Sequence, residues 1–99
     1  MTTTITLDGT TLTAAIEGRI DTQTAPELEK ELLKSLDGVR DLIFDFTQVS
    51  YISSAGLRTV LSTQNQMDAA GGTMVLRGCN KNILGVFKVT GFDGFLTFE

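Results

Sequence analysis

The stretch Phe44–Leu61, FDFTQVSYISSAGLRTVL, decides how this chain folds. It begins within a short, nearly continuous apolar run, Leu42–Phe46, and ends in a segment whose apolar residues recur at helical spacing. An apolar run of this kind between two helical segments is typical of a strand buried on both faces of a largely parallel sheet. We therefore predict a strand at residues 42–46, a connection at 47–53 and a helix over about 54–70.

The predicted helix has one apolar side and a glycine stop. Its expected inward residues recur every three or four positions and are Leu57, Val60, Leu61, Gln64 and Met67. Gly71-Gly72 predicts the turn that ends it. Beyond that turn, residues 74–76 predict a buried strand and residues 95–98 a short last strand. Between them, Ile83, Leu84 and Phe87 predict a short third helix. Gly91 is expected directly after the third helix, where a residue comfortable at positive φ is favoured.

The N-terminal part of the chain has the pattern of a hairpin. Apolar and polar residues alternate on both sides of Asp8-Gly9-Thr10, from Ile5 to Leu7 and again from Leu12 to Ile16. Such alternation around a glycine-containing turn predicts two antiparallel strands. We expect the second of them to end at Gly18.

A helix start follows the hairpin. Thr24 stands at an N-cap position, Pro26 falls in the first turn and Glu27 comes three residues after Thr24, which together predict a capping box. The apolar residues Leu28, Leu32 and Leu36 then recur every four positions. Asp37-Gly38 is expected to end this helix.

The predicted order is ββαβαβαβ in a single domain over residues 1–99. Strands that alternate with helices favour an α/β fold with right-handed crossovers. We expect a largely parallel central sheet covered by helices, with the antiparallel hairpin at its N-terminal end. In such folds the functional residues usually gather at the carboxyl ends of the parallel strands.

Composition limits the partners of the chain. Its net charge is −4, and its eight Lys and Arg residues are scattered from Arg19 to Lys88, which argues against binding nucleic acid or a membrane surface. The apolar runs are far shorter than the ~20 residues that cross a bilayer, and no signal peptide is visible. The lone cysteine, Cys79, fits a reducing compartment. We expect a soluble, cytoplasmic protein without membrane insertion.

The groups that most enzymes need are missing. The chain has no histidine, no phosphate-binding G-x-x-x-x-G-K-[ST] loop and no G-x-S-x-G motif. A nucleophilic Ser54 or Cys79 would lack an activating group, so we expect no enzyme, no metal site and no cofactor. Cys79 is interpreted as a small apolar residue. Asp45 is interpreted as a hydrogen-bonded structural residue that orders the loop after its strand, with a carboxylate near the functional site as the alternative.

Ser54 is the main candidate for a functional residue, because it is predicted at a helix start. There the first N–H groups lack partners and the helix dipole is positive. Ser54 therefore has two compatible interpretations, an N-cap or a phosphorylation site whose added anion repels a docked protein. Gly56 also has two interpretations. Its missing side chain either lets a kinase or phosphatase approach the backbone next to Ser54, or allows close packing of the helix on the sheet.

Several segments together resemble the bacterial STAS-domain anti-sigma factor antagonists over essentially the whole chain. These segments are Glu17–Asp21, Thr24–Pro26, Leu42–Phe46, Val49–Leu57, Gly71–Leu76 and Val89–Phe92. The resemblance implies a protein that, when unphosphorylated, binds an anti-sigma factor that is also a serine kinase and thereby releases the sigma factor. It also implies that the kinase phosphorylates a switch serine to end the binding, and that a metal-dependent serine phosphatase restores it.

By position, the resemblance places the switch at Ser54, with Ser53 as the second choice. The docking face that it implies comprises Asp21, Thr22, Ser53, Ser54, Ala55, Gly56 and Arg58. Many kinase-regulated members have Asp directly before the switch serine, where this chain has Ser53. A rival interpretation is a STAS subunit that is never phosphorylated and assembles on another protein, such as the ATPase of a transporter.

Overall fold

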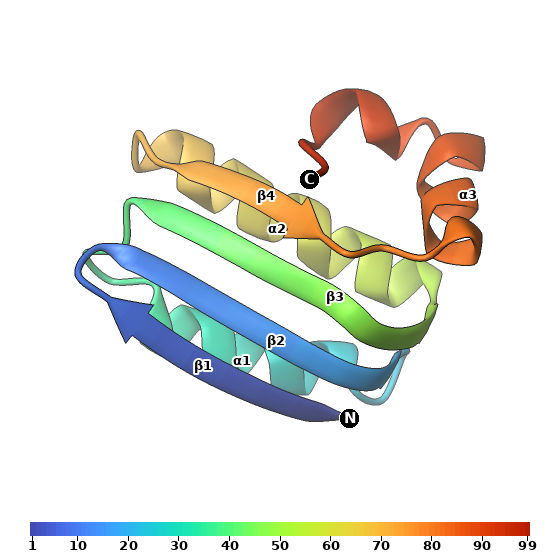
Figure 1. The fold of residues 1–99 in the computed structure, drawn as a ribbon, viewed down its shortest axis with the longest axis horizontal. Coiled ribbons are helices and arrows are strands. Elements are labelled where there is room, and N and C mark those ends of the chain that lie inside the picture. The colour runs from blue at the N-terminus through green and yellow to red at the C-terminus, as the bar shows by residue number, and fades with distance from the viewer.

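A computed structural model describes residues 1–99, which form a four-stranded sheet. Figure 1 shows helices lying behind this sheet. The strands are β1 (Thr2–Asp8), β2 (Thr11–Ile20), β3 (Asp41–Ile52) and β4 (Thr73–Arg77). The helices are α1 (Ala25–Ser35), α2 (Ser54–Ala69) and α3 (Lys81–Val89), followed by the 3-10 turn η1 (Phe92–Phe95). The sheet order is β1-β2-β3-β4, with β1 antiparallel to β2 and the other pairs parallel. The predicted α/β class and N-terminal hairpin are confirmed.

The hairpin turns on Gly9, whose φ of +63° suits glycine in a tight turn. Asp8 pairs with Thr11 across that turn. The prediction that the second strand ends at Gly18 is wrong, because β2 continues to Ile20. Gly18 has a φ of +103° and lies at an irregularity in the pairing with β3, which the strand passes without ending.

The strand β3 differs from the prediction in length and in burial. It runs from Asp41 to Ile52 rather than over 42–46, because its second half stays paired with β2 up to the Ile20–Ile52 pair. Its burial alternates along the first half, with Leu42, Phe44 and Phe46 buried and the residues between them only half-buried. The expectation of burial on both faces is therefore wrong: α1 and α2 cover one face of the sheet, as Figure 1 shows.

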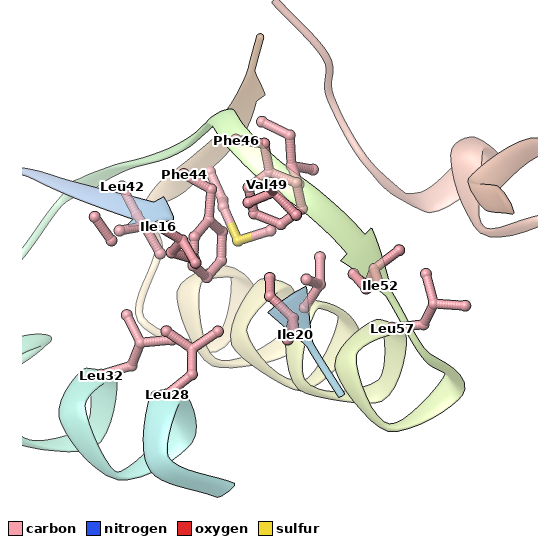
Figure 2. Close-up of a cluster of buried hydrophobic side chains, with 14 of the residues drawn as sticks. Ile16, Ile20, Leu28, Leu32, Leu42, Phe44, Phe46, Val49, Ile52 and Leu57 are labelled. Atoms are coloured by element: carbon pink, nitrogen blue, oxygen red, sulfur yellow. The ribbon is translucent and has the colours of Figure 1, made fainter. Parts of the chain in front are cut away.

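The core lies between the sheet and these two helices. Figure 2 shows Leu28 and Leu32 of α1 and Leu57 of α2 facing the inward residues of β2 and β3. Twenty buried hydrophobic residues form one cluster, and each fully buried Leu or Phe contributes about 1.5–3 kcal/mol relative to an exposed one. None of the helices combines the length and apolar character needed to cross a membrane.

The inward side of α2 lies slightly off the predicted one. Leu57, Val60 and Met67 are buried as expected, but Leu61 and Gln64 are only half-buried. Two threonines take the remaining buried positions, Thr59 and Thr63. Their hydroxyls donate to the carbonyls four residues earlier, at 3.2 Å and 2.7 Å, so the core accepts them without an unpaired polar group.

The capping box predicted at the start of α1 does not form. Thr24 occupies the N-cap position, but its side chain makes no capping hydrogen bond. Its hydroxyl donates instead to the carbonyl of Arg19 at 2.8 Å and accepts from the amide of Asp21 at 2.8 Å. The Thr24 hydroxyl is therefore used within the loop between β2 and α1 and is not available to cap the helix. Gly38 has a φ of +78° just after α1, as its predicted role at the helix end requires.

The last part of the chain confirms one prediction and corrects another. Gly91 follows the C-cap of α3 and has a φ of +77°, as predicted. The expected last strand at 95–98 is wrong, since the chain forms η1 and then a single parallel bridge between Phe98 and Leu76. The Phe98 ring packs edge-on against Phe87 of α3, with the centroids 5.4 Å apart. This packing on α3 holds the end of the chain without further strand pairing.

Candidate functional site

The start of α2 gives different roles to two adjacent serines. Ser53 is the N-cap residue, in extended conformation, and its hydroxyl accepts a hydrogen bond from the Gly56 amide at 3.3 Å. Ser54 is the first residue of the helix and is exposed. Its hydroxyl takes part in no hydrogen bond within the protein, because the cap is supplied by Ser53. The N-cap interpretation of Ser54 is therefore wrong by one residue, and the hydroxyl of Ser54 is free.

The strand ends place these serines beside the loop that leads into α1. The amide of Ser53 donates to the carbonyl of Ile20 at 2.8 Å, directly after the pair that ends β2 and β3. Asp21 follows Ile20, so the loop carrying Asp21 lies alongside the first turn of α2. This is the edge formed by the carboxyl ends of parallel strands, where α/β proteins usually place their functional residues.

The loop carrying Asp21 is held by its own hydrogen bonds. One carboxylate oxygen of Asp21, Oδ1, accepts from the amides of Gln23 and Thr24, each at 3.0 Å. These bonds, the one from Thr24 first, lower the pKa of the Asp21 carboxyl, and Arg19 adds to the effect. Thr22 is exposed in this turn. The loop therefore presents an ionised carboxylate and an exposed hydroxyl in a fixed conformation.

Gly56 lies in the first turn of α2 and is buried on the side that faces the sheet. A Cβ at this position would lie 2.7 Å from Cγ1 of Ile52 and 2.9 Å from Cγ2 of Ile20. The close-packing interpretation of Gly56 is confirmed, and the residue does not belong to the exposed surface. Ala55 beside it is half-buried, whereas Arg58 is exposed one turn after Ser54.

A shallow cleft lies between α1 and α2 next to the free serine. Its volume is about 270 Å³. Ala25, Pro26 and Glu29 of α1 line one side of it. The other side comes from α2 and comprises Ala55, Arg58, Thr59 and Ser62. A protein docked over Ser54 would thus contact a concave surface lined by both polar and apolar side chains.

Two functional candidates were missed by the sequence reasoning, Arg19 and Tyr51. They are register neighbours on β2 and β3, and the guanidinium carbon of Arg19 lies 4.2 Å from the centroid of the Tyr51 ring. Both are exposed. No local pattern could have found them, because the predicted strands end at Gly18 and Phe46, before either residue. In the structure each directly precedes the last inward residue of its strand, Ile20 or Ile52, and so lies on the opposite face at the same edge.

Asp45 is hydrogen-bonded, as interpreted, but the expectation that it orders a loop after its strand is wrong, because its partner Thr47 belongs to the same strand. Asp45 lies in the middle of β3, well before its carboxyl end, and accepts hydrogen bonds from the amide and the hydroxyl of Thr47. These bonds, the hydroxyl first, lower the pKa of Asp45. Cys79 is half-buried, and burial raises the pKa of its thiol to about 11, so the reactive thiolate is scarce at neutral pH.

Comparisons with known proteins find relatives of this chain. The STAS domain family model matches residues 3–99. BtrV of Bordetella bronchiseptica, named as an anti-sigma factor antagonist, is 37% identical over 82 residues, which cover 82% of this chain and 71% of that protein. The anti-sigma-B factor antagonist of Bacillus subtilis is 30% identical over 81 residues, covering 82% and 74% of the two chains.

The fold is also similar to solved structures of SpoIIAA from Bacillus, an anti-sigma factor antagonist. The unphosphorylated form superposes with a TM-score of 0.79 at 16% identity and covers 99% of this chain and 87% of that one. The phosphorylated form gives a TM-score of 0.78 at 17% identity, with coverages of 99% and 91%. At these identities the likeness concerns the arrangement of the strands and helices.

Proposed function

The chain belongs to the STAS domain family of anti-sigma factor antagonists, and we propose that it binds an anti-sigma serine kinase while Ser54 is unphosphorylated. Phosphorylation of Ser54 by that kinase ends the binding, and a serine phosphatase restores it. The protein acts in the cytoplasm as a partner for other proteins and has no catalytic step of its own.

The observation that supports this proposal is the free, exposed hydroxyl of Ser54 at the start of α2. A kinase reaches it without opening the core, because the buried residues of the first turn are Gly56 and Leu57. The product is also compatible with the fold, since a helix N-terminus stabilises a nearby anion through its N–H groups and its dipole. Phosphorylation therefore changes the surface and leaves the scaffold intact.

The added charge provides the switch. A phosphoserine carries about −1.5 to −2 charges at pH 7 and is strongly hydrated. A partner docked over Ser54 would have to desolvate that anion, and each 1.4 kcal/mol of such a penalty weakens binding about tenfold. A penalty of a few kcal/mol is enough to separate the two proteins without a conformational change.

The hydrogen bond of Ser53 favours Ser54 as the modified residue. The Ser53 hydroxyl is half-buried and accepts from the Gly56 amide, so a phosphate on it would disturb the cap of α2. We propose a docking face around Ser54 that includes the loop with Asp21 and Thr22 and, on α2, Ala55 and Arg58. Gly56 supports this face from below by letting α2 approach the sheet.

The proposal is tested in two steps: the binding partner is identified first, and phosphorylation of the protein is then measured by intact mass spectrometry. A pull-down from the native cytoplasm followed by mass spectrometry identifies the captured protein, which we expect to contain a serine kinase domain. The purified kinase and ATP should then add one phosphate to the wild type and to Ser53→Ala, and none to Ser54→Ala. Ser53→Ala is the matched control, because it removes the neighbouring hydroxyl and keeps the target.

The rival function gives a different result in the same experiment. A STAS subunit that assembles on another protein, such as a transporter ATPase, would capture that protein and would stay unmodified with ATP. Binding that is unchanged in Ser54→Asp would also favour assembly, because a charge at this position would then not matter.

A further inference from the structure

We infer that Arg19 and Tyr51 form a further part of the docking face, where the guanidinium of Arg19 binds a carboxylate of the partner kinase. This inference rests on the proposed function, because it extends the same interface around the strand ends. Arg19 lies two residues before Asp21, and Tyr51 lies two residues before Ser53. The pair is therefore continuous with the loop and the helix start that flank Ser54.

The Arg19 side chain is held in place but is not saturated with partners. Its guanidinium lies over the Tyr51 ring at 4.2 Å, and its Nε is 3.8 Å from Oδ2 of Asp21. The Arg19 side chain is still 61% exposed. No acceptor of the protein lies within hydrogen-bond distance of its terminal nitrogens, in contrast to Arg77, which is bonded to Glu99 at 2.9 Å. The Arg19 guanidinium is thus oriented, and the N–H groups of its terminal nitrogens are free to donate to a partner.

This arrangement fits a carboxylate of a partner. The planar guanidinium presents paired donors that match the two oxygens of a carboxylate. A side chain that is already ordered loses less conformational entropy when it binds. Arg and Tyr are also the residue types enriched among the strongest contributors to protein interfaces. Arg58 is a second exposed cation at this edge, one turn after Ser54, but it lines the cleft between α1 and α2 on the other side of the sheet from Arg19.

Tyr51 acts through Arg19 and is a positioning residue. Its ring face attracts the guanidinium and fixes its plane. Phe at this position keeps the ring face, whereas Leu removes it. The Tyr51→Phe variant is therefore expected to bind the kinase like the wild type, and Tyr51→Leu is expected to bind more weakly.

Calorimetry against the purified anti-sigma kinase from the pull-down, without ATP, tests the inference. Removal of a charged hydrogen-bonding group should weaken binding about 10- to 100-fold in Arg19→Ala. Arg19→Lys keeps the charge without the planar fork and should recover only part of the affinity. Arg40→Ala is the matched control, since Arg40 is exposed at the opposite end of the sheet and should bind unchanged. Thermal unfolding of every variant verifies that it is folded.

A double variant and a salt series separate recognition from structure. Because Tyr51 acts through Arg19, Tyr51→Leu should add little to Arg19→Ala in the combined variant. Salt should also weaken wild-type binding more steeply than binding of Arg19→Ala. Wild-type affinity in Arg19→Ala, with phosphorylation of Ser54 still abolishing binding, overturns this inference alone. A wild type that binds no anti-sigma kinase overturns the inference and the proposed function together.

Discussion

The amide of Ser53 donates a 2.8 Å hydrogen bond to the carbonyl of Ile20, and this bond joins the two halves of the proposed docking face. Ile20 ends β2 and leads into the loop with Asp21, while Ser53 caps the helix that begins with Ser54. The bond therefore fixes the position of one half relative to the other before any partner arrives. The free hydroxyl of Ser54 lies directly beside this junction.

Replacing Ser53 by Ala should destabilise the protein. The variant loses the side-chain cap of the Gly56 amide, and such a loss costs about 0.5–2 kcal/mol. For a domain of this size each kcal/mol corresponds to about 4–8 °C in Tm. Calorimetric melting of Ser53→Ala and Ser54→Ala checks this, because Ser54 has no hydrogen bond to lose. An equal drop in both variants would contradict the division of roles between the serines.

Replacing Gly56 by Ala should also destabilise the fold, because the added methyl group would overlap Ile52 and Ile20. Overpacking of this kind costs about 1–3 kcal/mol. Gly85 in α3 offers a matched control, since a Cβ there would meet no atom within 4 Å. Gly85→Ala is expected to stabilise by about 0.5–1 kcal/mol through the better helix propensity of Ala. Urea denaturation of the two variants should give changes of opposite sign.

Replacing Ser54 by Asp should separate binding from folding. A negative charge at the first position of α2 is favourable for the helix, by about 0.3–1 kcal/mol at low salt. The Tm should therefore stay the same or rise slightly, while the affinity for the anti-sigma kinase falls. Calorimetric titration of that kinase with Ser54→Asp and with Ser54→Asn, which lacks the charge, measures the effect. Equal affinities for the two variants would contradict a charge switch.

Asp21 should contribute to stability above its pKa and lose this contribution in acid. Hydrogen bonds from the Thr24 and Gln23 amides lower its folded pKa below 3.8, so the folded state favours the ionised form. Its contribution is present above the unfolded pKa and disappears as the pH falls through the folded value. Asp21→Asn should be less stable than the wild type at neutral pH, and the gap should narrow below about pH 4. Unfolding curves across pH 2–7 measure the gap, and a gap independent of pH would argue against this role.

Cys79 should be slow to alkylate at neutral pH. Burial raises its pKa to about 11 from 9.0, so little thiolate forms below that range. The thiol therefore stabilises the fold below pH 9, and this contribution fades as the pH rises from 9 toward 11. Iodoacetamide labelling followed by mass spectrometry should show slow modification of the native protein and fast modification in urea. Rapid native labelling at pH 7 would contradict a half-buried, protonated thiol.

Local patterns predicted much of the fold and the region of the site. The hairpin around Gly9, the helix with Leu28 and Leu32 and the exposed serine at the start of α2 follow from short periodicities. The second half of β3 does not, because TQVSYI has no clear period of its own. It is a strand because β2 continues beside it to the Ile20–Ile52 pair. Residues 95–98 are the opposite case, because their local pattern predicts a strand that does not form. Phe98 packs on α3 instead and makes a single bridge to β4.

By itself the sequence determined the α/β class, the order of the first seven elements and the placement of Ser54 at a helix start, since these depend on neighbours along the chain. The tertiary structure alone decided that Ser53 is the cap and Ser54 is free, that Gly56 is a packing residue, and that Arg19 lies on Tyr51. Each of these depends on how β2 and β3 align at their carboxyl ends. That alignment follows from the burial of Ile20 and Ile52 against α2, which no local pattern encodes.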